Sequence, residues 1–112
     1  MSDADTVVFV PAWNEERSIA RTLNALARQT YRGPMEVVLA DNNSTDRTAE
    51  VAERAALAHG LDYRRVFEPE AGKHHALNSA LKTVTTPLVV TVDADTLLHE
   101  DALSYLTARV TS

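Results

Sequence analysis

Hydrophobic residues in this chain gather in four short runs, and apolar residues between the runs recur every three or four positions. The runs cover residues 6–10, 36–40, 63–67 and 88–92. They are rich in β-branched residues, and each is followed by a polar residue or a proline, so we expect four β-strands. The longer periodicity between the runs predicts helices.

The first predicted helix follows Asn14, which we expect to cap it, with Glu15 and Glu16 in its first turn. Its apolar stripe falls at i, i+4, i+7 and i+8, and we expect the helix to end near residues 31–34. The stripe consists of Ile19, Leu23, Leu26 and Ala27.

The second predicted helix starts after a cap at Ser44 or Thr45 and stops at Gly60. We expect its inward face to hold Val51, Ala55 and Ala58. A short third helix is expected around residues 74–82 and a fourth from about residue 100. Their expected inward residues are Leu77, Ala80 and Leu81 in the third, and Leu103, Leu106 and Val110 in the fourth.

Strict alternation of apolar strands with helices predicts an α/β fold, a mainly parallel four-stranded sheet covered by helices and joined by right-handed crossovers. At 112 residues, the chain is expected to form one domain over residues 1–112. Ligands of such sheets bind outside the carboxyl ends of the strands, so the site is expected at that edge.

Composition excludes several classes of function. The chain has 11 basic and 16 acidic residues and a net charge of −5, which argues against nucleic acid or anionic lipid as a partner. It has no cysteine, so any metal is expected to be a hard ion bound by oxygen. The acidic first residues do not fit a signal peptide, and no apolar run approaches the roughly 20 residues of a membrane span. We therefore expect a cytoplasmic chain.

The unusual residues all follow the predicted strands. "PAWNEE", "DNNSTD", "EPEAGKHHALN" and "DADT" come after the first, second, third and fourth strand, whereas the loops at the opposite edge read as ordinary turns. In the last of these segments Asp93 and Asp95 alternate along an extended backbone, so both carboxylates can face one divalent cation. The alternative is that they cap a helix or remain solvated in a loop.

The other polar residues at this edge also allow two interpretations. Lys73 follows a glycine at the start of a helix and is either a surface lysine or a phosphate ligand, whereas Asn78 alone favours a helix-to-loop hydrogen bond. Trp13 is a lid over the core or a stacking surface for a base or sugar. Asp41 belongs to an Asx-rich turn or accepts a hydrogen bond from a base. The adjacent histidines of "KHHAL" point about 100° apart on a helix and are not expected to share an ion.

Four segments in order, "VVFVPAWNEERSIARTLNAL", "EVVLADNNSTDRTAEVA", "EAGKHHALNSAL" and "LVVTVDADTLLHEDAL", resemble the nucleotide-binding half of a family 2 glycosyltransferase of the GT-A fold. The resemblance covers residues 6–108. It implies a Rossmann-like half-domain that binds a nucleotide-diphospho-sugar, usually a UDP-sugar, with Mg²⁺ or Mn²⁺ for inverting transfer to an acceptor hydroxyl. The wording of "GKHHALNSAL" and "DADT" also resembles the polysaccharide-synthase branch, which implies a parent protein at the cytoplasmic face of the membrane.

The resemblance also implies roles for residues at matching positions. The nucleoside pocket would be lined by Pro11, Ala12, Trp13 and Glu15. Asp41 would read the uracil ring, and Lys73 and Asn78 would lie near the base and phosphates. Asp93 would contact the nucleotide and share the metal with Asp95, the more direct ligand.

Two departures from the family pattern affect the expected function. The usual D-D-G-S is here "DNNS", so Asn42 lacks a carboxylate and Asn43 replaces a glycine, a change that asparagine tolerates at left-handed angles. The acceptor-binding half and the catalytic base, commonly an acid, are not recognisable, so the catalytic residue is unknown. We therefore expect a truncated donor-binding domain, inactive or weak alone. The alternative is a non-catalytic nucleotide-binding module, or one that self-assembles through the surface left by the missing half.

Two other families with acids at strand ends fit less well. A haloacid dehalogenase phosphatase places its acids after the first strand and needs threonine where this chain has Leu97. A receiver domain also needs acids after the first strand, where this chain has "PAWNEE".

Overall fold

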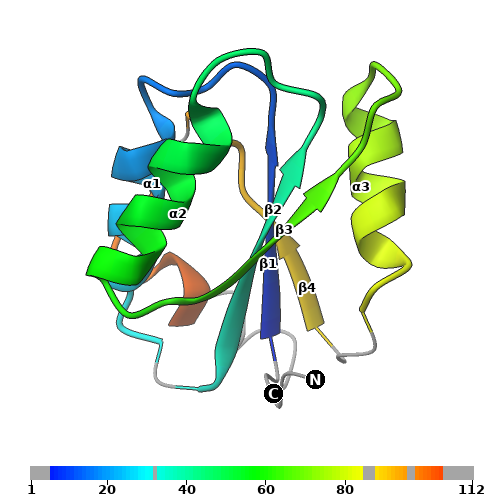
Figure 1. Ribbon diagram of the computed structural model, residues 1–112. Helices are drawn as coiled ribbons and strands as arrows, with labels where there is room; N and C mark the ends of the chain where they lie inside the picture. The colour runs from blue at the N-terminus through cyan, green and yellow to red at the C-terminus, as the bar shows by residue number, and fades with distance from the viewer. Residues whose placement is uncertain (1–5, 32, 85–87, 96–97, 105–112) are drawn as a thin grey trace.

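The computed structural model describes residues 6–31, 33–84, 88–95 and 98–104. They form a parallel four-stranded sheet in the order β3-β2-β1-β4 (Figure 1). The strands are β1 (Thr6–Ala12), β2 (Met35–Asp41), β3 (Asp62–Phe67) and β4 (Leu88–Thr91). All four strand predictions are confirmed, with ends within two residues of those expected from the sequence.

Helices cover both faces of the sheet. Figure 1 shows α1 (Ile19–Ala27) and α2 (Thr48–Ala58) side by side on one face, and α3 (Lys73–Leu81) on the other. The larger core lies under α1 and α2, and a smaller one, which includes Phe9, Val38 and Ala76, lies under α3. The predicted α/β class is therefore confirmed. No helix among the described residues is long and apolar enough to cross a membrane.

The order of the strands reverses beside β1. The chain passes from β1 to β2 and β3 in one direction, and then returns across the sheet to place β4 on the other side of β1. Carboxyl ends on the two sides of such a point leave a crevice between the loops that follow them. The segments after β1 and β4 therefore flank the position at which a ligand is expected.

The predicted N-caps of the first two helices are wrong, whereas the predicted stop of the second helix at Gly60 is confirmed, since α2 ends at Ala58 and Gly60 has a φ of 65°. Helix α1 has Ser18 at its N-cap position and α2 has Arg47, instead of Asn14 and Ser44 or Thr45. Asn14 adopts a left-handed φ of 52°, and its side-chain oxygen accepts a hydrogen bond from the Thr45 N–H in the loop after β2. Glu15 and Glu16 consequently lie in a turn ahead of the helix. The first helix also ends earlier than expected, at Ala27.

Three details of the helix faces differ from the predictions. The buried residues of α2 are Thr48, Ala52 and Ala56, with Val51 and Ala55 at the margin, whereas Ala58 is exposed. In α3, Ala76 and Ala80 are buried and Leu77 is partly buried, but Leu81, the last residue of the helix, is 49% exposed. In the fourth predicted helix, residues 102–104 are helical with Leu103 fully buried, and Leu106 and Val110 lie outside the described residues.

Candidate functional site

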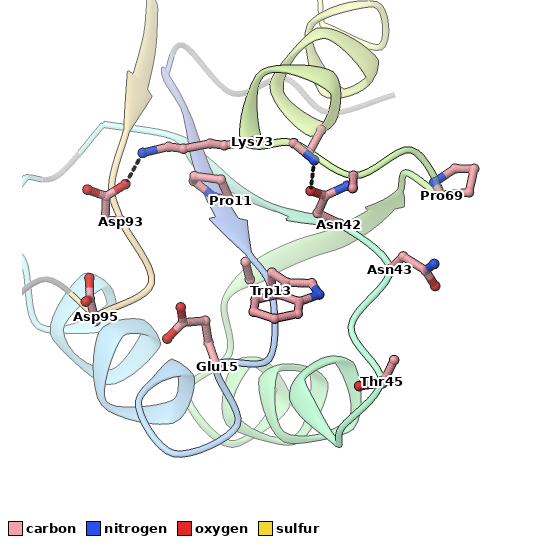
Figure 2. A pocket seen from close by; sticks show the side chains of 14 residues that line it. Pro11, Trp13, Glu15, Asn42, Asn43, Thr45, Pro69, Lys73, Asp93 and Asp95 are labelled. Atoms are coloured by element: carbon pink, nitrogen blue, oxygen red, sulfur yellow. Dashed lines mark hydrogen bonds and ion pairs between the residues drawn. The ribbon is translucent and has the colours of Figure 1, made fainter.

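A cleft of about 560 Å³ opens at the carboxyl edge of the sheet (Figure 2). Its walls come from the segments that follow all four strands, as the distribution of unusual residues predicted. In Figure 2, Asp93, Asp95 and Glu15 lie on one side of Trp13, and Asn43, Thr45 and Pro69 lie on the other. The lining consists of Pro11, Ala12, Trp13, Glu15, Asn42, Asn43, Thr45, Pro69, Ala71, Gly72, Lys73, Ala76, Asp93 and Asp95.

Most of the expected site residues meet in this cleft. It is lined by Pro11, Ala12, Trp13, Glu15, Lys73, Asp93 and Asp95. Trp13 is 61% exposed and borders the cleft, so it is not a lid over the core. An exposed indole of this kind offers a flat face to a ring.

Asp41 and Asn78 are not among the residues that line the cleft. Asp41 is only 1% exposed, and its Oδ2 accepts hydrogen bonds from Nε and Nη2 of Arg65 at 2.9 and 2.7 Å. Its Oδ1 accepts the Ser44 N–H, so the carboxylate holds β3 and the loop after β2 together. Asn78 is an exposed residue of α3, beyond the turn that reaches the cleft.

Lys73 and Asp93 face one another across the cleft. The Lys73 Nζ lies 2.5 Å from Oδ1 of Asp93 (Figure 2), and both side chains are more than half exposed. An exposed ion pair is worth about 0–1 kcal/mol, so a bound anion or cation can displace either partner at little cost. The arrangement places one positive group in the same cleft as two carboxylates.

The D-x-D turn is fastened to α1 by a buried hydroxyl. Thr22, fully buried, donates from Oγ1 to the carbonyl of Ala94 at 2.5 Å, and Ala94 itself is buried. Ala94, the residue between the two acids, is therefore held against α1, while Asp93 and Asp95 stay exposed. Sequence periodicity placed Thr22 in a helix but gave no signal for this bond, because its partner lies far along the chain.

Replacing Thr22 by valine is expected to lower the affinity of the two carboxylates for a divalent cation, with Mn²⁺ as the probe, by about three- to tenfold, since one hydrogen bond contributes about 0.5–1.5 kcal/mol. Electron paramagnetic resonance of free Mn²⁺ measures this affinity. Thr83→Val is the matched control, because its hydroxyl donates to the Ala80 carbonyl at the far end of α3. Equal affinities in the two variants would contradict a role for Thr22 in holding the turn.

The loop that carries Trp13 and Glu15 is tied to the start of α2. The Asn14 Oδ1 accepts the Thr45 N–H at 2.8 Å, and the Asn14 N–H donates to Oγ of Ser44. The Glu15 N–H donates to Oγ1 of Thr48 at 2.8 Å. These bonds join the loops after β1 and β2 into one wall of the cleft.

Several lining residues were not singled out from the sequence as site residues. Asn42, Asn43 and Thr45 follow β2, and Pro69, Ala71 and Gly72 precede α3. Asn43 has a φ of 59°, as expected for an asparagine that replaces glycine. Their position after strand ends was the only available signal, because apolar and amide side chains carry no charge pattern.

Comparison with known proteins identifies the family. The sequence profile described as glycosyl transferase family 2 matches residues 7–112. The chain belongs to this family. An uncharacterised glycosyltransferase of Mycobacterium bovis is 39% identical over 108 residues, which are 96% of this chain and 44% of that relative. The family 2 chain thus spans less than half the length of this relative.

Two solved glycosyltransferase structures share the fold of this family 2 chain. The mannosyltransferase PcManGT of Pyrobaculum calidifontis, in complex with GDP-Man and Mn²⁺, has a TM-score of 0.88 at 36% identity, over 97% of this chain and 33% of that one. TarS of Staphylococcus aureus, in complex with UDP-GlcNAc, has a TM-score of 0.78 at 30% identity, over 94% of this chain and 30% of that one. The α/β sheet described above is therefore the GT-A fold, as the resemblance implied.

The two carboxylates of the glycosyltransferase cleft fit a divalent cation. Asp93 and Asp95 line the same end of the cleft, and among the described residues no group of three or more His, Cys, Asp or Glu could hold an ion alone. Mg²⁺ commonly takes one or two carboxylates from the protein and the rest of its ligands from phosphates and water. The pair thus fits an ion shared with a phosphorylated ligand better than an ion held by protein alone.

Proposed function

We propose that this family 2 glycosyltransferase chain binds a nucleotide-diphospho-sugar with Mg²⁺ or Mn²⁺ for inverting glycosyl transfer. The observation that carries the proposal is the single cleft that joins Trp13 at its centre with Asp93, Asp95 and Lys73 at one end. A nucleotide-diphospho-sugar needs both a flat surface for a ring and charged groups for the diphosphate. The cleft supplies both over a span built by four loops.

The charged end of the cleft is proposed to bind the diphosphate. Asp93 and Asp95 would hold the cation, and Lys73 would leave Asp93 to donate to a phosphate oxygen. The N-terminus of α3 lies at the same cleft, where Gly72 and Lys73 line it. A helix N-terminus favours an anion.

These groups assist departure of the leaving group. When bound, the cation supplies positive charge that stabilises the developing charge on the diphosphate. Lys73 adds a second positive group, and Thr22 keeps the two carboxylates in place. The proton of the acceptor hydroxyl needs a base, and we assign that role to none of the described residues. The chain spans only 44% of its Mycobacterium bovis relative. Glycosyl transfer itself is therefore proposed for the whole protein, and donor binding for this chain.

The proposed donor is a UDP-sugar. TarS supports this choice because it was solved with UDP-GlcNAc, whereas the structure of PcManGT contains GDP-Man. The other end of the cleft, which includes Asn43, Thr45 and Pro69, is proposed to take the nucleoside. Asp41 would contact a base only by sharing its carboxylate with Arg65.

Calorimetric titration with UDP and with GDP, each with and without Mn²⁺, tests the proposal. We expect UDP to bind more tightly when Mn²⁺ is present and more tightly than GDP. Tighter binding of GDP than of UDP would contradict a UDP-sugar donor and indicate a GDP-sugar donor instead. Absence of binding to either nucleotide with Mn²⁺ would refute a donor site in this chain.

A further inference from the structure

Asn42 connects the sheet to the loop that precedes α3. It directly follows β2, its N–H donates to the Ala12 carbonyl, and only 8% of its surface is exposed. Its side-chain Nδ2 donates to the carbonyls of Glu68 and Glu70 at 3.2 and 2.6 Å, and its Oδ1 accepts the Gly72 N–H at 2.8 Å (Figure 2 shows this last bond). One side chain thus binds three points of the 68–72 loop.

These three bonds require an amide. An asparagine side chain offers two N–H donors and an acceptor oxygen, whereas an ionised aspartate offers acceptors only. A carboxylate at position 42 would place an oxygen against the carbonyls of Glu68 and Glu70, which can only accept. Where the family's D-D-G-S has its second aspartate, this chain has Asn42. The change removes a negative charge, and it also adds two N–H donors that bind carbonyls of the 68–72 loop.

The 68–72 loop leads directly to the phosphate end of the cleft. Gly72 has a φ of 127°, which side-chain-bearing residues rarely adopt, and it is the N-cap residue of α3. Lys73 comes next and reaches Asp93 across the cleft. Glu68 accepts hydrogen bonds from the Ser79 hydroxyl of α3 and from the Glu70 N–H of its own loop, which lower its pKa below the usual value. The loop is thus fastened to α3, and Asn42 joins it to the end of β2.

We propose that Asn42 is a positioning residue of the donor site, which holds Gly72 and Lys73 where they meet the diphosphate. This inference rests on the proposed function, because it assigns the diphosphate to Lys73. Asn42 acts through the 68–72 loop, so its effect on binding depends on the presence of the Lys73 ammonium. A residue that only stabilised the fold would affect nucleotide binding equally with and without Lys73.

A double-mutant cycle tests this dependence. Asn42→Asp removes the two donors with almost no change in shape. Asn78→Asp makes the same chemical change at an exposed residue of α3 that does not line the cleft, so that it reports the effect of the added charge. In the presence of Mn²⁺, we expect Asn42→Asp to lower UDP affinity about tenfold more than Asn78→Asp, the loss of one to two hydrogen bonds. When Asn42→Asp is added to a Lys73→Ala variant, we expect UDP affinity to fall by less than about a further twofold. Equal effects of the two aspartates, or an undiminished effect without Lys73, would overturn the inference.

Hydrogen exchange provides a second measurement that needs no ligand. We expect Asn42→Ala, which adds no charge, to speed amide exchange in residues 68–76 while leaving the amides of β1 and β2 protected. Unchanged exchange in residues 68–76 would overturn the inference even if the native chain bound neither UDP nor GDP. If the native chain binds nucleotide and the cycle shows no coupling, the inference fails and the proposed function stands.

Discussion

Replacement of Asp95 by asparagine is expected to lower the affinity for UDP in the presence of Mn²⁺ by about 100-fold, because even residues that only orient metal ligands cost 10–100-fold when they are changed. The substitution keeps the shape of the side chain and removes the charge that the cation needs. In the absence of metal, UDP affinity is expected to change by less than about threefold, since Asp95 then repels the diphosphate only weakly across solvent. Calorimetric titration under both conditions measures the two effects.

Asp62→Asn is the matched control for this variant. Asp62 is an exposed acid that begins β3, at the edge of the sheet opposite the cleft, so it undergoes the same loss of charge far from the proposed metal. We expect it to retain metal-dependent UDP binding within about twofold, because its distance from the cleft exceeds the screening length in physiological salt. An Asp95 variant that still gained affinity from Mn²⁺ would contradict the assignment of the D-x-D as the metal site.

Replacement of Lys73 by glutamine is expected to change two affinities in opposite directions. UDP affinity with Mn²⁺ falls about 10- to 100-fold, because a hydrogen bond between charged groups contributes about 1.5–3 kcal/mol. Affinity for Mn²⁺ without nucleotide rises by up to about fivefold, since Asp93 is freed from an exposed ion pair worth about 0.2–1 kcal/mol. Calorimetry measures the first and electron paramagnetic resonance the second.

Lys82→Gln serves as the control for the Lys73 variant. Lys82 is an exposed lysine at the C-cap of the same helix, so the change in net charge is identical but lies at the far end of α3. A fall in both affinities for Lys73→Gln would mean that Lys73 supports the metal site rather than competing with the cation for Asp93.

Sequence patterns predicted the sheet and the edge that carries the cleft because both depend on local rules. Apolar β-branched runs mark strands wherever they occur, and parallel strands necessarily bring their following loops to one edge. Asp93 and Asp95 could be proposed as a pair because only one residue separates them. Trp13 and Lys73 could be placed at the same edge for the same reason, without any knowledge of which strands are neighbours.

The features that the sequence did not reveal depend on partners far apart in the chain. Asn14 looked like a helix cap because the residues after it favour a helix start, but its oxygen is used by Thr45. Asp41 looked accessible at a strand end, yet Arg65 of the neighbouring strand covers its carboxylate. Asn42 looked like a missing acid, and its three bonds to the next loop appear only when β2 and β3 lie side by side. Each case turns on a pairing that local patterns do not encode.

The position of β4 has a consequence for how the chain folds. Strand β1 pairs with β2 over residues that are near in sequence, but its pairing with β4 brings Thr6 beside Leu88. Loop closure over a longer stretch of chain costs more entropy, and non-local parallel pairings form slowly. The strand that leads into Asp93 is therefore expected to dock after β1, β2 and β3 have assembled. Metal-dependent nucleotide binding followed during refolding would thus report the final step of assembly, separately from the earlier formation of helices.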